Sequence, residues 1–380
     1  MAHGSAHFEV LAPRSKFYQG PFGRLCPDLP PWKPAGVEEG ELDAYFLNIA
    51  SNMMVEAPGL TPSEIASDND KIAELEAAFS SNIPAGYTYF GQFVDHDITF
   101  DPASSLMRQN DPNGLLNFRT PRLDLDNVYG RGPADQPYLY SKDDKAKLLI
   151  GSIENSGLRD VPRNSDGTAL IGDMRNDENA IVSQLQLAFL LAHNALVDRA
   201  RSQGHDNPFE AARNTLRWLY QHVVWHDFLK RITIDEIHQC ALLLGNLCGG
   251  RKGWICALED VYSWSKSPFM PVEFSVAAYR FGHSMVRNSY QTNHPHRGFN
   301  NFAPIFDNSG ASNPDDLRGF RRLLVENTVQ WDWFLPMTSS AGPFPQMARK
   351  IDTKLVLWCF YHHRCGTAYC QQPGHPRRPV

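Results

Sequence analysis

The sequence predicts a mainly α-helical protein with long loops and little β-structure. The strongest sign is the stretch from Asp177 to Arg201, which is rich in Leu, Ile, Val and Phe and contains neither Gly nor Pro. Few segments alternate polar and apolar residues over the length of a β-strand. Residues 101–140 and 291–318 are instead rich in Pro, Asn or Gly, which is typical of long loops.

The expected elements follow one another along the chain. Residues 1–40 are rich in Pro and Gly, so we expect an extended arm that lies over a surface. The helix over residues 177–201 is apolar around most of its circumference, which predicts a buried central position. Further helices are expected, in chain order, over residues 61–80, 209–232, 233–247, 274–286 and 316–329.

The length and composition restrict the class of protein. With 380 residues, of which 42% are apolar, the chain can bury a substantial core. The formal net charge of −6, from 36 Lys and Arg against 42 Asp and Glu, argues against nucleic acid or an anionic membrane surface as a partner. The longest purely apolar run, residues 187–192, is far shorter than the ~20 residues that cross a bilayer, so we expect no membrane span.

The first residues and the cysteines bear on location. Residues 1–10 lack the apolar stretch of a signal peptide, and the seven cysteines include no Cys-x-x-Cys pair. We therefore expect reduced thiols and a cytoplasmic protein. Secretion by a non-standard route is the alternative.

A histidine between two aspartates forms the most informative motif. The segment Gly91 to Asp97 reads Gly-Gln-Phe-Val-Asp-His-Asp, so that His96 lies between Asp95 and Asp97. Burying these charged groups among aromatic residues costs free energy unless each group has a partner. The segment is therefore either a hydrogen-bonded cluster that caps a helix or part of a functional site.

Two further clusters place charged residues on helices. Arg175 and Glu178 lie three residues apart and so share one helical face, although acidic residues at a helix start also stabilise the helix dipole without any other role. His283 lies within the helix expected over residues 274–286. A single helical histidine is more commonly a hydrogen-bonded core residue than a ligand, but Gly282 beside it leaves room for a flat, bulky group.

Oxygen-bearing residues alternate along one Pro-containing loop. In an extended chain, residues two apart point to the same side. Oxygen ligands of this kind suit Ca²⁺, especially if Asp97 joins them. A solvated acidic loop is the alternative. The alternating residues are Thr120, Arg122, Asp124 and Asp126.

Taken together and in this order, the four segments resemble the motifs of the animal-type haem peroxidase family, the superfamily of myeloperoxidase and peroxidasin. Its bacterial and fungal members are the most similar. The resemblance covers residues 20–355 and implies the mainly α haem peroxidase fold of the animal, myeloperoxidase-like type. It also implies a haem-dependent peroxidase that reduces hydrogen peroxide while oxidising a halide, thiocyanate or organic donor.

The resemblance implies a role for each residue around the haem. His283 would be the proximal ligand to the haem iron. On the other face, His96 would take a proton from hydrogen peroxide and pass it to the departing oxygen. Arg175 would stabilise the negative charge that develops as the O–O bond breaks. Gln92 would order water or a halide.

The resemblance also implies how haem and calcium are held. Haem b would be linked covalently through Asp95 and Glu178, with Arg280 near a propionate. Asn179 stands where myeloperoxidase has a methionine, so a third link should be missing, which argues against strong chloride oxidation. The implied calcium ligands are Asp97, Thr120, the Arg122 carbonyl, Asp124 and Asp126.

One position separates the peroxidases from the oxygenase branches of the superfamily. Fatty-acid dioxygenases typically carry a radical-forming tyrosine three residues before the proximal histidine. Here that position is Arg280, and Tyr279 is one step away. A peroxidase is therefore favoured over a lipid dioxygenase.

The C-terminal part departs from the family pattern. The family's downstream Asn-x-x-Arg-x-Arg-x-His segment, whose asparagine orients the proximal histidine, has no counterpart, and residues 356–380 change abruptly in composition. We expect a disordered tail after a haem peroxidase domain, residues 41–355, that is truncated at its C-terminus. A catalytically impaired paralogue that binds haem and calcium is the alternative to an active enzyme.

Overall fold

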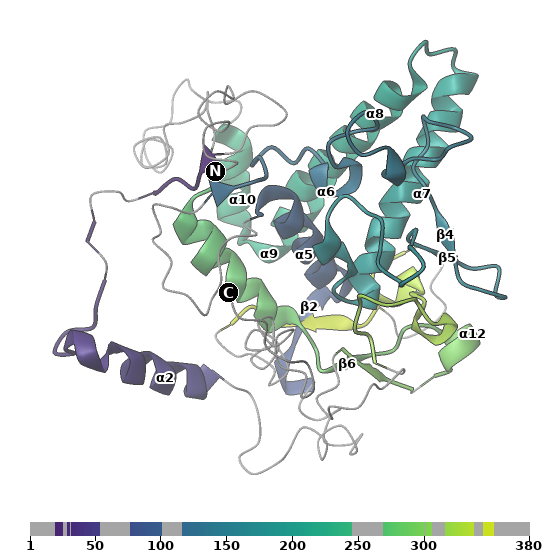
Figure 1. Ribbon diagram of the computed structural model, residues 1–380. Helices are drawn as coiled ribbons and strands as arrows, with labels where there is room; N and C mark the ends of the chain where they lie inside the picture. Colours follow the sequence, from purple (N-terminus) through teal and green to yellow (C-terminus); the bar gives the residue numbers. More distant parts are fainter. Residues whose placement is uncertain are drawn as a thin grey trace, which may run out of the picture.

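The computed structural model describes residues 20–25, 29–30, 32–53, 77–100, 116–244, 269–299, 301–305, 316–337 and 345–352. Within these residues the fold is mainly helical, as the sequence predicted, and β-structure is confined to short pairs (Figure 1). The tail over 356–380 and most of the region expected to be helical over 61–80 lie outside the described residues. The division into an arm, 1–40, and a domain, 41–355, stays a prediction.

Helix α7 (Ala180–Ser202) is the central helix that the sequence predicted. It packs against α8 (Pro208–Val223) and α5 (Gly86–Ile98), as Figure 1 shows for α7 and α8. The helix begins at Ala180, three residues later than expected, because the Asn179 side chain accepts hydrogen bonds from two backbone N–H groups of the first turn. The preceding residues form a separate 3-10 turn, η3 (Met174–Asp177).

Helix α7 is also the one helix, among the described residues, that is long and apolar enough to cross a membrane. The run-length criterion applied to the sequence missed it, because Gln184 and Gln186 interrupt the apolar stretch. Both glutamines are buried and hydrogen-bonded inside the protein, and most of the apolar stretch is buried as well. These are the features of a core helix.

The helix expected over 209–232 is present, with one irregular turn. Helix α8 runs into a π-helical turn, η4 (Val224–Phe228), and then into α9 (Leu229–Ile232). The π turn directs Phe228 into the core, where its ring meets Phe90 edge-to-face with 5.4 Å between centroids. The next expected helix is α10 (Asp235–Leu244), and its predicted end at residue 247 lies outside the described residues.

The segment expected as a helix over 274–286 is helical but not α-helical. It consists of a π-helical turn, η5 (Glu273–Ala277), followed by a 3-10 helix, η6 (Ala278–Met285), which contacts α5. At the junction, the Arg280 Nε–H donates to the Ser275 carbonyl oxygen at 2.9 Å. The side chain thus uses a carbonyl that an α-helix would pair with a backbone N–H four residues later.

The prediction of a helix over residues 316–329 is wrong. Only a short 3-10 turn, η7 (Val325–Asn327), forms there. Phe320 adopts a left-handed backbone with φ of 51°, and its N–H donates to the Asp177 carbonyl oxygen at 2.8 Å. A Cβ on Gly319 would lie 1.6 Å from that same oxygen, so the strand-like segment needs glycine to approach η3 this closely. Pairing with η3 therefore overrides the local helical pattern.

The described strands form antiparallel pairs. One of these pairs positions α5. Strand β2 (Ser80–Pro84) pairs with β8 (Met347–Arg349), and the Ala85 N–H, just before α5, donates to the Gln346 carbonyl oxygen at 2.8 Å. The pairs are β1 (Gly20–Pro21) with β3 (Leu116–Asn117), β2 (Ser80–Pro84) with β8 (Met347–Arg349), β4 (Gly151–Ser152) with β5 (Arg159–Asp160), and β6 (Ser289–Tyr290) with β7 (Ala303–Pro304).

Short helices complete the described structure. Helix α2 stands apart from the helical body in Figure 1. In the loop expected over 101–140, the described residues contain only short elements, in agreement with the sequence. The remaining elements are η1 (Glu39–Glu41), α2 (Leu42–Met53), α6 (Asp126–Tyr129), η2 (Pro137–Leu139), α12 (His294–Arg297) and η8 (Trp331–Trp333).

Candidate functional site

Helix α5 carries three consecutive ionisable residues into the core. The exposed fractions of Asp95, His96 and Asp97 are 6%, 4% and 1%. The helix ends at Ile98, where the Thr99 hydroxyl donates to the Asp95 carboxylate at 3.0 Å and to its carbonyl oxygen at 2.9 Å. Charged groups buried this deeply require specific partners, and each of the three has contacts with a different segment.

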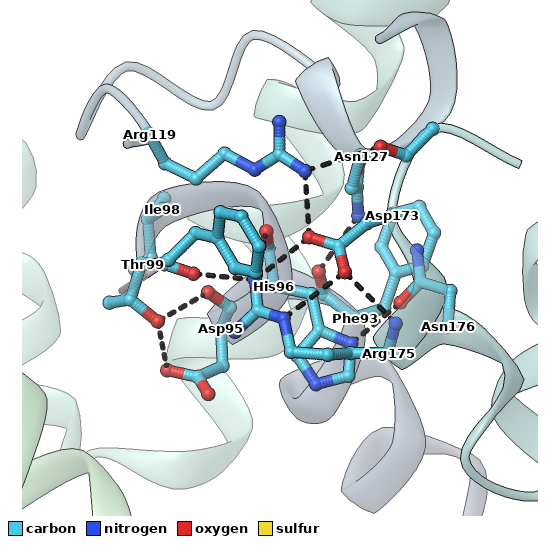
Figure 2. Close-up of polar contacts among 12 residues, drawn as sticks. Phe93, Asp95, His96, Ile98, Thr99, Arg119, Asn127, Asp173, Arg175 and Asn176 are labelled. Atoms are coloured by element: carbon cyan, nitrogen blue, oxygen red, sulfur yellow. Dashed lines mark hydrogen bonds and ion pairs between the residues drawn. The ribbon is translucent and has the colours of Figure 1, made fainter. Parts of the chain in front are cut away.

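His96 is held as a neutral base. Its Nδ1 lies 2.7 Å from the Asn176 side-chain oxygen, as Figure 2 shows. An amide oxygen can only accept, so Nδ1 carries the proton and Nε2 keeps its lone pair. Burial, together with the nearby Arg175 charge, lowers the pKa of His96 to about 4. At neutral pH the imidazole is therefore uncharged and able to accept a proton at Nε2.

The side chain of Arg175, a residue of η3, reaches the C-terminal end of α5. Its Nη2 donates to the carbonyl oxygens of His96 and Thr99 at 3.0 and 2.6 Å, and to the Asp173 carboxylate at 2.8 Å (Figure 2). Burial alone would raise the pKa of Asp173, but Arg175 and Arg119 hold that pKa well below its usual range. The guanidinium thus caps the helix dipole and keeps its positive charge beside the His96 residue.

Gln92 is fixed between two residues from the start of α7. Its amide nitrogen donates to the Glu178 carboxylate at 2.8 Å, and its amide oxygen accepts from Asn179 Nδ2 at 3.0 Å. Burial raises the pKa of Glu178 to about 6, even though Arg175 and the Gln92 hydrogen bond act to lower it. Asn179 therefore both caps α7 and orients Gln92, a role that the sequence did not reveal.

The proximal segment packs directly against α5. Arg280 Nη1 donates to the Asp95 carboxylate at 3.1 Å, and the Tyr279 hydroxyl donates to the Gly91 carbonyl oxygen at 2.8 Å. His283 Nδ1 lies 2.7 Å from the Arg280 carbonyl oxygen. Because a carbonyl only accepts, this contact places the His283 proton on Nδ1 and the lone pair on Nε2, the nitrogen that a metal would bind.

The residues of this site fit a haem. A Cβ built on Gly282 would have no heavy atom within 4 Å, so there is open space at Gly282, the residue that precedes His283. The backbone carbonyl of Arg280 supplies the second hydrogen bond that a ligating histidine needs, in place of the asparagine that the sequence lacks. Carboxylates at Asp95 and Glu178 and the Arg280 cation complete a donor set of the right kind.

The loop with alternating oxygen-bearing residues is brought to Asp97. Asp97 Oδ2 accepts the Leu125 N–H at 3.2 Å, whereas Oδ1 is buried without a hydrogen-bond partner. Burial and the neighbouring Asp126 carboxylate raise the pKa of Asp97 to about 7, and burial raises the pKa of Asp126 to about 6. The orphaned oxygen and the raised pKa values fit a cation placed between these carboxylates.

The loop does not by itself form a closed metal cage. The Thr120 hydroxyl donates to the Asp124 carboxylate at 2.7 Å, and Gln221 Nε2 donates to the Arg122 carbonyl oxygen at 3.2 Å. Among the described residues, no group of three His, Cys, Asp or Glu side chains is arranged to hold a metal ion. A calcium site here would need the hydroxyl and carbonyl ligands as well as the carboxylates.

Sequence reasoning missed several of the partners. Asp173 and Asn176 belong to the cluster around Arg175, and Gln186 lies on α7. All three contact the residues around His96, yet the sequence predicted no role for any of them. The one available signal was a polar residue, Gln186, inside an apolar helix. Such a residue needs a buried partner, although the sequence does not say which one.

The comparisons with known proteins establish the family. The animal haem peroxidase family model matches residues 105–327, which is more than half of the chain, and the chain therefore belongs to that family. The matched range includes Arg175, Glu178 and His283. Helix α5 lies just before this range, so the assignment of His96 rests on its motif and on its contacts.

Two similar curated proteins share only part of their length with this chain. Heme peroxidase 2 of Caenorhabditis elegans is 25% identical over 55% of this chain and 36% of that protein. A peroxidase-like protein of Margaritifera margaritifera is 30% identical over 31% of this chain and 14% of that protein. The chain thus spans about a third or less of the length of these relatives.

A solved structure supports the fold. Peroxidase A of Dictyostelium discoideum superposes with a TM-score of 0.52 at 14% identity, covering 88% of this chain and 66% of that chain. This likeness confirms the haem peroxidase fold that the sequence predicted. Membership of the animal haem peroxidase family implies haem binding.

Proposed function

We propose that the chain is a haem-dependent peroxidase that reduces hydrogen peroxide and oxidises a halide, thiocyanate or organic donor. The observation that carries the proposal is His96, a buried neutral imidazole whose Nε2 lone pair is kept unprotonated by the contact between Nδ1 and Asn176. A second histidine with the same tautomer, His283, lies on a helix packed against the helix of His96.

Four residues of the chain would hold the haem. His283 would bind the iron through Nε2, and Arg280 would pair with a propionate. Asp95 lies on α5 with His96 and Gln92, and Glu178 accepts a hydrogen bond from Gln92, so each would be placed to form an ester with a haem methyl. When bound, haem supplies an iron atom that coordinates peroxide and exchanges electrons with it.

The chain's own residues then move one proton. With haem bound, His96 Nε2 would accept a proton from hydrogen peroxide and return it to the departing oxygen, which would leave as water. The Arg175 guanidinium would stabilise the negative charge that develops on the departing oxygen. The amide of Gln92, held from both sides, orders a water molecule or a halide.

We also propose that Ca²⁺ binds between Asp97 and the loop. The support is the buried Asp97 Oδ1 without a partner and the repulsion between Asp97 and Asp126. Because Asp97 directly follows His96, a bound cation would also fix the end of α5. The ligands would be Asp97, Thr120, the Arg122 carbonyl, Asp124 and Asp126.

Reconstitution with haem tests the proposal. The purified chain is mixed with haem, the Soret band is recorded, and guaiacol oxidation is followed after addition of hydrogen peroxide. We expect a Soret band and turnover from the parent chain, and a Soret band without turnover from His96→Ala. A Soret band without turnover in the parent chain would identify the impaired paralogue instead, and a chain that takes up no haem would contradict both.

One observation bears on the alternative lipid dioxygenase. The position three residues before His283, where such enzymes carry a tyrosine, is occupied by Arg280, which is ion-paired with Asp95. The hydroxyl of the adjacent Tyr279 donates to the Gly91 carbonyl oxygen of α5 at 2.8 Å. A fatty acid added with dioxygen and without peroxide should therefore not be oxidised by the haem-loaded chain.

A further inference from the structure

We propose that Asn176 and Gln186 are positioning residues that set which nitrogen of His96 carries the proton. The inference rests on the proposed function, because a base at Nε2 matters only if His96 moves the peroxide proton. It concerns two residues for which the sequence predicted no role.

The three side chains form a buried chain of hydrogen bonds across three elements. His96 from α5 contacts Asn176 from η3 at 2.7 Å, and Asn176 Nδ2 donates to Gln186 Oε1, from α7, at 2.8 Å. Asn176 and Gln186 are completely buried, with exposed fractions of 0%. Water therefore cannot replace either partner, and the arrangement depends on the two amides alone.

The order of donors and acceptors ties the two amides to the imidazole. Because the Asn176 amide nitrogen donates to Gln186, the Asn176 amide oxygen must face His96. This contact fixes the proton on Nδ1. If both amides were turned over, Gln186 would donate to Asn176, and Asn176 would donate to Nδ1. The His96 proton would then sit on Nε2, and that nitrogen could not accept the peroxide proton.

This arrangement leaves one polar atom, the Gln186 amide nitrogen, without a hydrogen bond. It is buried and has no hydrogen-bond partner. Leaving a buried donor unpaired destabilises a protein. Buried groups left unpaired in a native structure call for a specific explanation, and the one that we infer is the fixed orientation of Asn176.

A set of substitutions separates this role from a structural one. Asn176→Leu removes the acceptor at similar volume, whereas Asn176→Asp keeps an acceptor, because an ionised carboxylate cannot donate. Gln184→Leu is the matched control, because Gln184 is a buried amide two residues away on α7 that accepts the Val329 N–H at 2.9 Å and does not touch His96.

The first measurement is the position of the proton itself. In the full chain labelled with ¹⁵N-histidine, protonated and unprotonated ring nitrogens have well-separated chemical shifts, and the His96 signals are identified by their loss in His96→Gln. We expect Nδ1–H in the parent chain, in Asn176→Asp and in Gln184→Leu, and a shift towards Nε2–H in Asn176→Leu. Unchanged His96 signals in Asn176→Leu would overturn the inference.

The second measurement is turnover by the haem-loaded chain. We expect kcat/KM for peroxide to fall by about 10- to 100-fold in Asn176→Leu, as is typical when an outer hydrogen-bond partner is lost, and to be restored towards the parent value in Asn176→Asp. Equal losses in Asn176→Leu and Gln184→Leu would contradict the inference. If the parent chain takes up haem but does not turn over, the proposed function fails, while the tautomer measurement still decides the role of Asn176.

Discussion

Arg280 donates from Nη1 to the Asp95 carboxylate at 3.1 Å, and this ion pair joins η6 to α5. The other Asp95 oxygen accepts the Thr99 hydroxyl, so the buried carboxylate has partners on both sides. The Arg280 guanidinium also donates to the Ser275 carbonyl oxygen. His283, three residues after Arg280, is therefore held against the helix that carries His96.

Replacing Arg280 should destabilise the protein modestly. Arg280→Gln leaves the buried Asp95 carboxylate with Thr99 alone, but the arginine side chain is 41% exposed, so solvent screens the pair. We expect the free energy of unfolding, from urea titration, to fall by about 1 kcal/mol. The matched control is Arg322→Gln, whose pairing with Glu154 is exposed on both sides. Equal changes in the two variants would contradict a specific role for the Asp95 pair.

The sequence could predict the residue types of the site but not the contacts between them. The apolar neighbours of His96 correctly indicated burial, because burying polar groups among aromatic residues demands partners. The partner, Asn176, lies 80 residues further along the chain, and its contact depends on how η3 packs against α5. Sequence spacing says nothing about such a distance.

The fold was predictable where local pattern and tertiary packing agree. Helix α7 satisfies both, since its apolar residues recur at helical spacing and are buried in the structure. Over residues 316–329 the two conflict: the pattern favours a helix, but Gly319 and Phe320 pair with the backbone of η3. Contacts with a distant segment decided the outcome, and these are invisible to a window of neighbouring residues.

Filling the space beside His283 should block haem without harming the fold. Gly282 has no heavy atom within 4 Å of a Cβ and does not have a positive φ, so Gly282→Val should leave the unfolding free energy of the haem-free chain nearly unchanged. Haem titration followed at the Soret band should show affinity weakened by at least tenfold. Gly40→Val, at another position with open space, is the control and should bind haem normally. Normal binding by Gly282→Val would show that haem lies elsewhere.

Covalent attachment can be tested by extraction. Joining a carboxylate oxygen of Asp95 or Glu178 to a haem methyl removes two electrons and one proton from that methyl, and hydrogen peroxide is the oxidant. After treatment with peroxide, we expect acidified organic solvent to leave haem on the parent chain. Asp95→Asn combined with Glu178→Gln should release all of it. Complete release from the parent chain would refute the ester links.

Stability should fall in mild acid because of a buried histidine outside the candidate site. His193 is fully buried, contacts the Tyr129 hydroxyl at 2.9 Å, and has its pKa lowered to about 4 by burial. In the unfolded chain the pKa is about 6.5, so below that pH the unfolded state binds a proton that the folded state refuses. The stability that the neutral His193 side chain contributes to the folded state is fully present above pH 6.5. It is lost as the pH falls from 6.5 to about 4.

The matching variant isolates the contribution of His193. His193→Gln cannot take up a proton, so its unfolding free energy should decline less steeply than that of the parent chain between pH 6.5 and 4, by up to about 3 kcal/mol over that interval. Urea titrations at several pH values measure the difference. His205→Gln, on an exposed residue, is the control and should follow the parent profile. Parallel profiles for all three proteins would show that His193 is not the group responsible.

Calcium should stabilise the chain through Asp97, and removing the carboxylate should reverse the effect. Without the ion, Asp97 is repelled by Asp126 and one of its oxygens has no partner, so in a chelator Asp97→Asn should be at least as stable as the parent chain. With Ca²⁺ at 100 times its dissociation constant, the parent should be stabilised by about 2.7 kcal/mol and the variant by much less. Thermal unfolding with Ca²⁺, Mg²⁺ or chelator measures the stability of both proteins. Mg²⁺ should stabilise the parent only weakly, because it demands a tighter octahedral site.

The control is Asp135→Asn, which removes an exposed loop carboxylate and should keep the full calcium response. A parent Tm that does not respond to Ca²⁺ would remove the ion from this loop and leave the Asp97 carboxylate without an explanation.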